Sequence, residues 1–401
     1  MFRKIQLHQE GILPFLKNKG TDPSVKKRHI DLSLAFTPLF KSDGFLPGRK
    51  TMSAQPIQVK SYAAFDTSAQ LKPFMIERRA LAADDVQIEI LYCGICHSDL
   101  HTINGDWGNK NYPLVPGHEI VGRVEAVGSN VKSYKLGDKV GVGCFVNSCQ
   151  TCSACQSHLE QYCEKGATFT YGSTDFQEKL THGGYSAKIV VTEKYVLRIP
   201  ENLALDAAAP LLCAGITTYS PLKNWGAGPK TKVAIAGLGG LGHMGVKLAQ
   251  AMGCEVTVLS TSESKINDAL KLGAHDVIVT KNADQLAKNK NRFDLILNTI
   301  SAPHSYDAYL GLLKLDGTMV LLGLPPGQNI SAGSLITKRR SLAGSLIGGI
   351  KETQEMLDFC GKHGITSDIE LIPIQKVNDA YQRMVKNDVK YRFVIDMKSL
   401  S

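Results

Sequence analysis

Alternating polar and apolar residues mark the part of the chain that begins near residue 55. The segments 86–91 and 120–128 alternate in this way, which is typical of half-buried strands, and strand-like sequence returns at 186–191. Many short strands with glycine turns between about residues 55 and 205 predict a small β-barrel. A cysteine-rich lobe, residues 144–172, interrupts the predicted barrel.

From about residue 206 the pattern changes to buried strands that alternate with helices. Helices are expected from about His243 to Met252 and from Lys265 to Leu272, and strands at 232–236, 255–259, 276–279, 293–297 and 317–322. This alternation predicts a doubly wound parallel sheet. The last segment holds an amphipathic helix, Glu352 to His363, and a strand-like end at 390–396. We expect it to return to the first domain.

The chain of 401 residues is too long for one ordinary core, so the fold class is α/β plus β in two domains. Residues 53–205 and 342–401 are expected to form the barrel domain, and residues 206–341 the inserted parallel-sheet domain. Residues 1–52 are an atypical basic extension outside both. Three interpretations of residues 1–51 compete: a targeting sequence, a disordered arm, or sequence upstream of a true start at Met52. The domain-like sequence just after Met52 favours the last.

The net charge of +9 is uneven, because residues 1–51 hold ten Lys and Arg against four Asp and Glu. The remainder carries only +3, which is no clustered basic face for nucleic acid. No uninterrupted apolar run is long enough to span a bilayer. Nucleic acid and membrane are therefore not expected as partners.

Four of the ten cysteines are closely spaced: Cys149, Cys152, Cys155 and Cys163. Cysteines at such short spacings can close on one tetrahedral zinc and leave no open position, as in structural sites. This spacing favours zinc over disulfides, and thiolate ligands imply a reducing compartment.

A glycine-rich loop follows the expected strand 232–236 and opens a helix, which is the context of a dinucleotide-binding turn. It comprises Gly237, Leu238, Gly239, Gly240, Leu241 and Gly242. Gly237 allows the tight turn, Gly239 lets the backbone approach the pyrophosphate, and Gly242 lets the helix pack on the strand.

The end of the second strand of this domain distinguishes NADP from NAD. An acidic residue there would hold the ribose 2′-hydroxyl and repel a 2′-phosphate. The chain has Ser260, Thr261 and Ser262 at this point, with Lys265 close behind, which favours NADP(H). Glu263 is the counter-argument, although it could instead serve as a first-turn acid of the following helix.

Two cysteines and a histidine predict a second, catalytic zinc site. Cys96, His118 and Cys213 supply three ligands and leave a fourth position open, as catalytic zinc requires. Glu119 is either an alternate ligand or a neighbour that shapes the field, and Asp99 is placed to accept the free ring N–H of His118. Ser98 could pass a proton from a bound alcohol, and His101 could carry it to solvent.

These motifs resemble the zinc-dependent medium-chain alcohol dehydrogenases, and most closely the cinnamyl alcohol dehydrogenase branch with its bacterial broad-specificity aldehyde reductases. The matching segments are 93–101, 115–122, 149–163, 212–221, 237–242, 344–348 and 388–394. The resemblance implies a GroES-like catalytic domain, an inserted Rossmann domain, two zinc ions per subunit, NADP(H) and a cytoplasmic homodimer. It further implies cofactor contacts from His97, Thr217, Ser345, Ile347 and Arg392, a proton relay through Ser98 and His101, and a substrate-pocket wall at Trp107.

The sequence thus predicts an NADP(H)-dependent and zinc-dependent alcohol dehydrogenase that acts mainly as an aldehyde reductase of broad specificity. A polyol dehydrogenase on the same scaffold is one alternative, but it would more often have a Glu ligand where Cys213 stands. A redox-sensing protein that binds zinc and nucleotide is another, but it would have lost a ligand or relay group. Trp107, where plant relatives differ, argues against a phenylpropanoid substrate.

Overall fold

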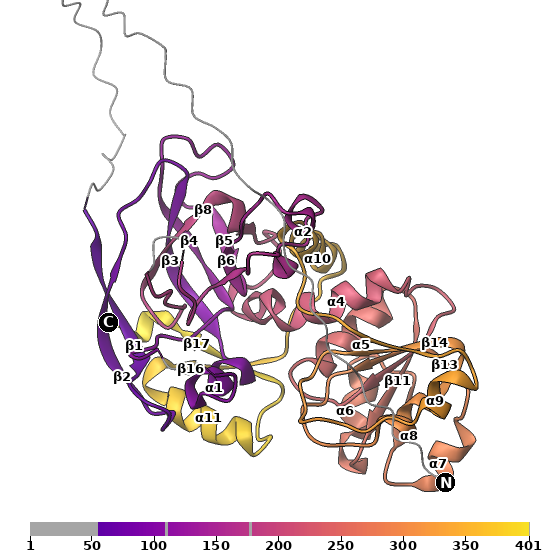
Figure 1. Ribbon diagram of the computed structural model, residues 1–401. Helices are drawn as coiled ribbons and strands as arrows, with labels where there is room; N and C mark the ends of the chain where they lie inside the picture. The colour runs from indigo at the N-terminus through magenta and orange to yellow at the C-terminus, as the bar shows by residue number, and fades with distance from the viewer. Residues whose placement is uncertain (1–54, 109–110, 176–178, 401) are drawn as a thin grey trace, which may run out of the picture. The chain divides into compact units, whose positions relative to one another are not determined.

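The computed structural model describes residues 55–108, 111–175 and 179–400 (Figure 1). The extension 1–52 therefore lies outside the described residues. Two larger sheets organise the described part, one of seven strands and one of six, with two small two-stranded sheets beside them. No helix in these ranges is both long and apolar enough to cross a membrane.

The seven-stranded sheet is mainly antiparallel and corresponds to the predicted barrel. Its strands are β3 (Asp85–Gly94), β4 (Ile120–Val127), β5 (Lys139–Val142), β8 (Lys188–Thr192), β9 (Leu197–Arg198), β16 (Ile369–Pro373) and β17 (Arg392–Asp396). The hairpin β1 (Ile57–Ala64) with β2 (Leu71–Arg78), and the pair β6 (Phe145–Asn147) with β7 (Thr168–Phe169), form the small sheets.

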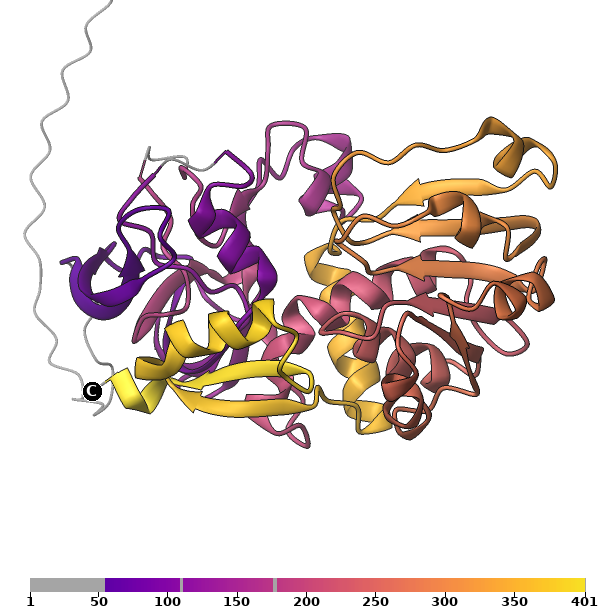
Figure 2. The same cartoon turned by 90° about the horizontal axis from the view of Figure 1, so that it is seen from below.

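The C-terminal segment joins this first sheet. Strand β17 pairs antiparallel with β3, with Val394 opposite Gly94, and parallel with β16. Figure 2 shows the segment in yellow, including α11 (Val377–Val385), beside the indigo N-terminal elements. Residues about 300 positions apart along the chain therefore stand next to one another where α1 (His97–Asn104) begins.

All the pairings in the six-stranded sheet are parallel, in the order β12-β11-β10-β13-β14-β15. The strands are β10 (Lys232–Ala236), β11 (Glu255–Ser260), β12 (Asp276–Val279), β13 (Phe293–Asn298), β14 (Leu313–Leu321) and β15 (Ser341–Gly344). Near-continuous apolar runs such as 233–236 are buried because helices cover the faces of a parallel sheet. The doubly wound sheet predicted from the sequence is confirmed.

The helices α5 (Gly242–Ala251), α6 (Ile266–Lys271) and α10 (Ile350–His363) agree with the expected segments to within a few residues. The structure also has α7 (Ala283–Lys288), α8 (Tyr306–Leu310), α9 (Ala332–Ile336), α4 (Ala214–Asn224) and the short α2 (Ser153–Gln156) and α3 (Leu205–Ala208), which the sequence pattern did not predict. Helix α4 is buried along most of its length and packs against α5 and α10. One apolar cluster includes Val121 of the first sheet, Ile216 of α4 and Val258 of the second sheet, so the two sheets share core.

A tight turn at Pro116 and Gly117 leads into strand β4. Gly117 has a φ of 103°, a backbone conformation that favours glycine. A Cβ atom there would lie 2.6 Å from the ring of Tyr185 and 2.8 Å from the sulfur of Cys93. The turn is therefore tight in both its backbone and its surroundings.

We predict that Gly117→Ala destabilises the fold more than Gly137→Ala. Both glycines have positive φ, but a Cβ at Gly137 would meet nothing within 4 Å. The backbone strain of about 1–2 kcal/mol is thus common to both variants, while overlap with the core should cost Gly117→Ala about 1–3 kcal/mol more. Urea unfolding of the metal-saturated proteins would measure the difference, and equal losses would contradict the steric argument.

Candidate functional site

Four buried side chains from separate parts of the chain form one potential metal site. Cys96 is the N-cap of α1, His118 and Glu119 precede β4, and Cys213 precedes α4. One ligand atom from each lies within 4.8 Å of all the others. Two sulfurs, an imidazole and a carboxylate suit zinc, so the residues fit the metal predicted for them.

Asp99 holds the orientation of the histidine in this cluster. Its Oδ1 lies 3.0 Å from Nδ1 of His118, so Nε2 is the ring nitrogen left for a metal. Asp99 is completely buried, as is expected for a carboxylate whose oxygens are occupied by donors. The partner of His118 inferred from the sequence is therefore present.

The surroundings shift the pKa values of the two cysteines in opposite directions. A hydrogen bond with Cys213, together with the charges of Arg392 and His118, holds the pKa of the Cys96 thiol well below its usual value. Hydrogen bonds with Cys144 and Cys96 raise the pKa of Cys213. A metal cation at this point would favour the ionised form of both sulfurs.

Glu119 faces both the cluster and an arginine. Its Oε1 accepts a hydrogen bond from Arg392 in a fully buried ion pair, whereas among the described residues Oε2 has no hydrogen-bond partner. Burial raises the pKa of Glu119 to about 7 although Arg392 opposes the shift. Glu119 is thus a buried carboxylate of the cluster with one oxygen left without a partner, the kind of acceptor that a metal can satisfy.

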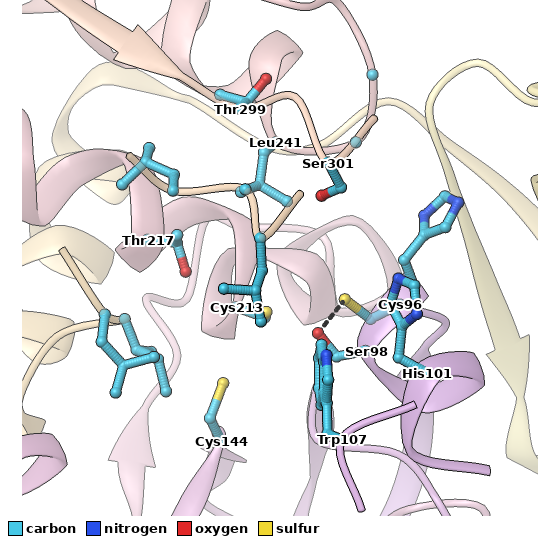
Figure 3. Close-up of a pocket in the computed structure, with 18 of the residues that line it drawn as sticks. Cys96, Ser98, His101, Trp107, Cys144, Cys213, Thr217, Leu241, Thr299 and Ser301 are labelled. Carbon is cyan, nitrogen blue, oxygen red and sulfur yellow. Dashed lines mark hydrogen bonds between the residues drawn. The ribbon is translucent and has the colours of Figure 1, made fainter. Parts of the chain in front are cut away.

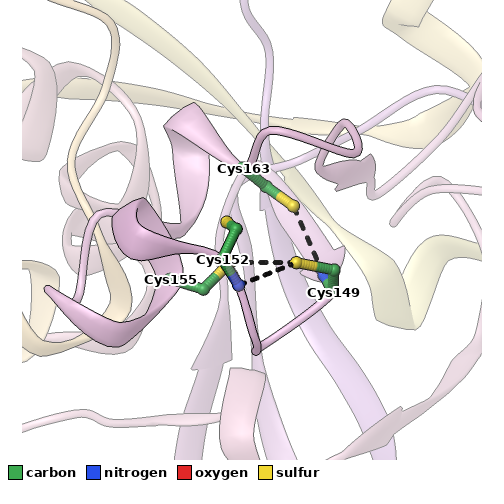
Figure 4. A group of neighbouring side chains, drawn as sticks. All are labelled: Cys149, Cys152, Cys155 and Cys163. Carbon is green, nitrogen blue, oxygen red and sulfur yellow. Dashed lines mark hydrogen bonds between the residues drawn. The ribbon is translucent and has the colours of Figure 1, made fainter.

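The four-cysteine group forms a second potential metal site (Figure 4). The sulfurs of Cys149, Cys152, Cys155 and Cys163 lie within 4.8 Å of one another, and all ten cysteines of the chain are free. Backbone amides point at the sulfurs, for example Cys149 N at 3.3 Å from the sulfur of Cys163. Hydrogen bonds from Thr151 lower the pKa of Cys149 to about 5. Converging sulfurs with amide donors suit a closed tetrahedral zinc site.

The glycine-rich loop has the geometry that a phosphate requires. Gly237 follows β10 with a φ of 91°, and a Cβ at Gly242 would lie 2.0 Å from the carbonyl oxygen of Gly237. A Cβ at Gly239, by contrast, would meet nothing within 4 Å. Arg392 lies against Gly240, where a Cβ would be 2.8 Å from its Cδ. The loop is thus packed where it turns and open where a ligand would approach.

A cavity of about 1420 Å³ connects the first cluster with this loop. Figure 3 shows Cys96, Cys213 and Ser98 facing it together with Thr217 and Leu241. Most of the predicted site residues line it: Cys96, His97, Ser98, His101, Trp107, His118, Cys213, Thr217, Gly237, Gly239, Gly240, Leu241, Lys265, Ser345, Ile347 and Arg392. The sequence motifs of the two domains therefore face one shared space.

Some predicted cofactor residues do not line this cavity. Ser260, Thr261 and Ser262 lie outside its wall, and the hydroxyl of Ser260 is 3.1 Å from the carbonyl oxygen of Ser262 in its own turn. Lys265 does line it, and its Nζ donates to the carbonyl oxygen of Leu238 at 3.0 Å. Glu263 is exposed at the first position of a 3₁₀ turn, in agreement with its interpretation as a first-turn acid.

The predicted relay residues lie near the mouth of the cavity. Ser98 Oγ is 3.6 Å from the sulfur of Cys96, next to the metal site. His101 is partly exposed, its Nδ1 lies 2.7 Å from Asp106 Oδ2, and its ring stacks on Trp107 at 5.2 Å. Trp107 is 50% exposed and is therefore a wall residue rather than a core residue.

Several cavity residues were missed by the sequence analysis. Cys144 begins the cysteine-rich lobe, and its thiol faces Cys213 and lies 3.7 Å from the carbonyl oxygen of Leu212. Tyr171 packs on the ring of His118 at 5.7 Å. Thr299 could have been found, because it directly follows β13 and ligands bind at the carboxyl ends of parallel strands.

Comparison with known families gives two matches. Residues 82–201 match the family described as alcohol dehydrogenase GroES-like domain. Residues 240–362 match the family described as zinc-binding dehydrogenase.

Individual relatives are similar over nearly their whole length. NADP-dependent alcohol dehydrogenase C of Mycobacterium bovis is 56% identical over 85% of this chain and 99% of that protein. Aldehyde reductase YahK of Escherichia coli is 54% identical over 86% of this chain and 100% of that protein. Among solved structures, a cinnamyl alcohol dehydrogenase of Sorghum bicolor has a TM-score of 0.83 at 45% identity, covering 85% of this chain and 98% of that chain. The enzyme of Helicobacter pylori complexed with NADP(H) has a TM-score of 0.81 at 45% identity, covering 86% and 99%.

We predict that Cys213→Ala lowers the metal content by one ion per chain without unfolding the protein. The variant loses one ligand of the first cluster but leaves the four-cysteine group intact. Cys254→Ala is a matched control, because Cys254 is an equally buried thiol outside both clusters. Elemental analysis after gel filtration measures the ratio, and an unchanged metal content in Cys213→Ala would refute the assignment.

Proposed function

The chain belongs to the zinc-binding alcohol dehydrogenases with a GroES-like domain, and we propose that it works mainly in the reductive direction, on a zinc bound by Cys96, His118 and Cys213. It is an NADP(H)-dependent alcohol dehydrogenase and aldehyde reductase that transfers hydride reversibly between nicotinamide and an aldehyde or primary alcohol of broad specificity. The observation that carries the proposal is the single cavity shared by the metal cluster and the glycine-rich loop.

Cys96, His118 and Cys213 would hold the catalytic zinc, with Glu119 as the neighbouring carboxylate. When bound there, zinc acts as a Lewis acid that polarises a carbonyl group and lowers the pKa of an alcohol. The cluster is buried, which keeps bulk water from competing for the site. Arg392 holds one oxygen of Glu119, so this carboxylate can serve as a ligand only through its other oxygen or after leaving the arginine.

A second zinc is proposed for Cys149, Cys152, Cys155 and Cys163, which gives two ions per subunit. Four cysteine ligands close such a site, so it would hold the loop between β6 and β7 and take no part in the reaction.

NADP(H) would lie along the cavity, with its pyrophosphate at the start of α5. We assign His97, Arg392 and the backbone of Gly239 to Gly242 to the pyrophosphate, and Thr217, Ser345 and Ile347 to the nicotinamide end; all except Gly242 line the cavity. The cofactor supplies the hydride, and Arg392 adds positive charge beside the phosphates. Lys265 follows the end of β11 by five residues and lines the cavity, so we assign it to the 2′-phosphate, while roles for Ser260, Thr261 and Ser262 rest on the sequence argument alone.

Ser98 and His101 would move the proton. The Ser98 hydroxyl donates a proton to the substrate oxygen during reduction, and His101 replaces that proton from solvent. The position of Ser98 beside Cys96 and the partial exposure of His101 support this order. Asp106 holds Nδ1 of His101, which leaves Nε2 free to exchange the proton. Trp107 would form a wall for an apolar substrate.

The domains and the assembly are also proposals. Residues 53–205 and 342–401 would form the catalytic domain, and residues 206–341 the Rossmann domain, as the pairing of β17 with β3 supports. In the described part of the chain β15 has a neighbouring strand on one side only, which suits a homodimer formed along that edge. Free cysteines support a reducing, cytoplasmic location.

Oxidation of NADPH with a panel of aliphatic, aromatic and branched aldehydes tests the function. We expect turnover with several of them, lost after removal of the catalytic zinc with a chelator and restored by added zinc. A comparison with NADH gives the cofactor preference. No turnover with any aldehyde in the presence of zinc would overturn the proposal.

We predict that Lys265→Ala weakens the binding of NADPH more than the binding of NADH. Loss of one charge-assisted contact with the 2′-phosphate costs about 1.5–3 kcal/mol, so we expect KM for NADPH to rise roughly 10-fold to 150-fold. Lys271→Ala removes an exposed lysine six residues further on and controls for the change in net charge. Equal effects of Lys265→Ala on both cofactors would refute the phosphate contact.

A further inference from the structure

Asp99 receives a hydrogen bond from outside the metal-binding segments. Its Oδ1 accepts from His118 Nδ1 at 3.0 Å and from Gly117 N at 3.1 Å. Its Oδ2 accepts from Cys96 N at 2.9 Å and from the hydroxyl of Tyr185 at 3.2 Å. A carboxylate has about two acceptor directions on each oxygen, so these donors fill them. The side chain of Tyr171 also makes a hydrogen bond with Asp99, and the donors other than the two tyrosines belong to the candidate zinc ligands or to the turn that leads to one.

Tyr185 also supports the turn that carries His118. It is fully buried just before β8, and its backbone N–H donates to the carbonyl oxygen of Pro116 at 3.0 Å. Its ring occupies the space beside Gly117, as the 2.6 Å approach of a Cβ at that position demonstrates. Tyr185 thus contacts both the turn that carries His118 and the carboxylate of Asp99, which orients His118.

A second tyrosine, Tyr381, donates a hydrogen bond to Tyr185. The hydroxyl of Tyr381, in α11, donates to the hydroxyl of Tyr185 at 3.4 Å and is buried at 3% exposure. A hydroxyl has a single proton, so the donation from Tyr381 is compatible with Tyr185 giving its own proton to Asp99. Tyr381 therefore donates to Tyr185, and Tyr185 and His118 both donate to Asp99, which connects the C-terminal segment with the histidine.

We propose that Tyr185 is a positioning residue for the catalytic metal, because it holds Asp99 in the orientation that aims Nε2 of His118 at the zinc. Tyr381 assists by orienting the Tyr185 hydroxyl. The proposal rests on the assignment of Cys96, His118 and Cys213 as zinc ligands. Without the hydroxyl, Asp99 loses one of the donors that hold it in a buried site, and the carboxylate gains freedom to rotate away from His118.

The test is the rate at which Tyr185→Phe loses zinc to a chromogenic chelator. Loss of a group that orients a metal ligand typically costs about 10-fold to 100-fold in metal affinity. We therefore expect release of one zinc to be roughly 10-fold faster or more, while release from the four-cysteine site keeps the parent rate. Tyr134→Phe is the matched control, because it removes a hydroxyl that donates to the carbonyl of Val196 and is remote from the Asp99 network. Zinc release at the parent rate in Tyr185→Phe would overturn the proposal.

Cobalt substitution separates positioning from general loosening of the fold. The ligand-field absorption of Co²⁺ at the catalytic site should shift in Tyr185→Phe and not in Tyr134→Phe, whereas a purely structural role would lower the melting temperature and leave the spectrum unchanged. The latter result would also overturn the proposal.

A double-mutant cycle tests the order of these hydrogen bonds. Tyr381→Phe should speed zinc release less than Tyr185→Phe does, and it should have no further effect in a Tyr185→Phe background, because Tyr381 acts through Tyr185. Fully additive effects would contradict this order.

The parent enzyme is the reference for the function itself. If it reduces no aldehyde, the proposed function fails. If it is active while Tyr185→Phe retains zinc at the parent rate, only this inference fails.

Discussion

The buried carboxylate of Asp99 is the constraint on which the catalytic side of the molecule depends. A fully buried charge is stable only when its oxygens are occupied by donors, and here the donors come from the start of α1, the turn before β4 and the segment before β8. Satisfying one carboxylate therefore fixes three segments of backbone at once. Cys96 and His118 are positioned as metal ligands because they belong to two of these segments.

The buried ion pair of Arg392 and Glu119 links the candidate metal site to the glycine-rich loop. Arg392 begins β17, and the pairing of β17 with β3 places it beside the cluster, while its side chain lies against Gly240. Each of the two buried charges is stabilised by the other, so a movement of either side chain changes the environment of the other. Arg392 therefore contacts both the candidate metal cluster and the glycine-rich loop.

Motifs whose members are close in sequence could be predicted almost completely. The four-cysteine lobe spans only fifteen residues, and the glycine-rich loop is a single turn after a strand, so local spacing already implies their geometry. The end of β11 was less predictable. Ser260, Thr261 and Ser262 have suitable hydroxyl groups, but the turn uses the Ser260 hydroxyl itself, and only Lys265 of that group reaches the cavity wall. Residue type indicated possible chemistry there, and the direction of each side chain depended on the fold.

The sequence by itself determined the kind of fold, the loop that suits a dinucleotide and the residues able to ligate a metal, because strand and helix periodicity, glycine requirements and ligand chemistry are local properties. Only the tertiary structure decided that Cys144 and Tyr171 face the candidate metal site and that Arg392 contacts both this site and the glycine-rich loop. It also decided that Tyr185 donates to Asp99 and that Tyr381 donates to Tyr185. These contacts join residues up to 273 positions apart, and no local pattern encodes them. They follow from strand pairing and from the need of buried polar groups for partners, which is satisfied only once the chain has folded.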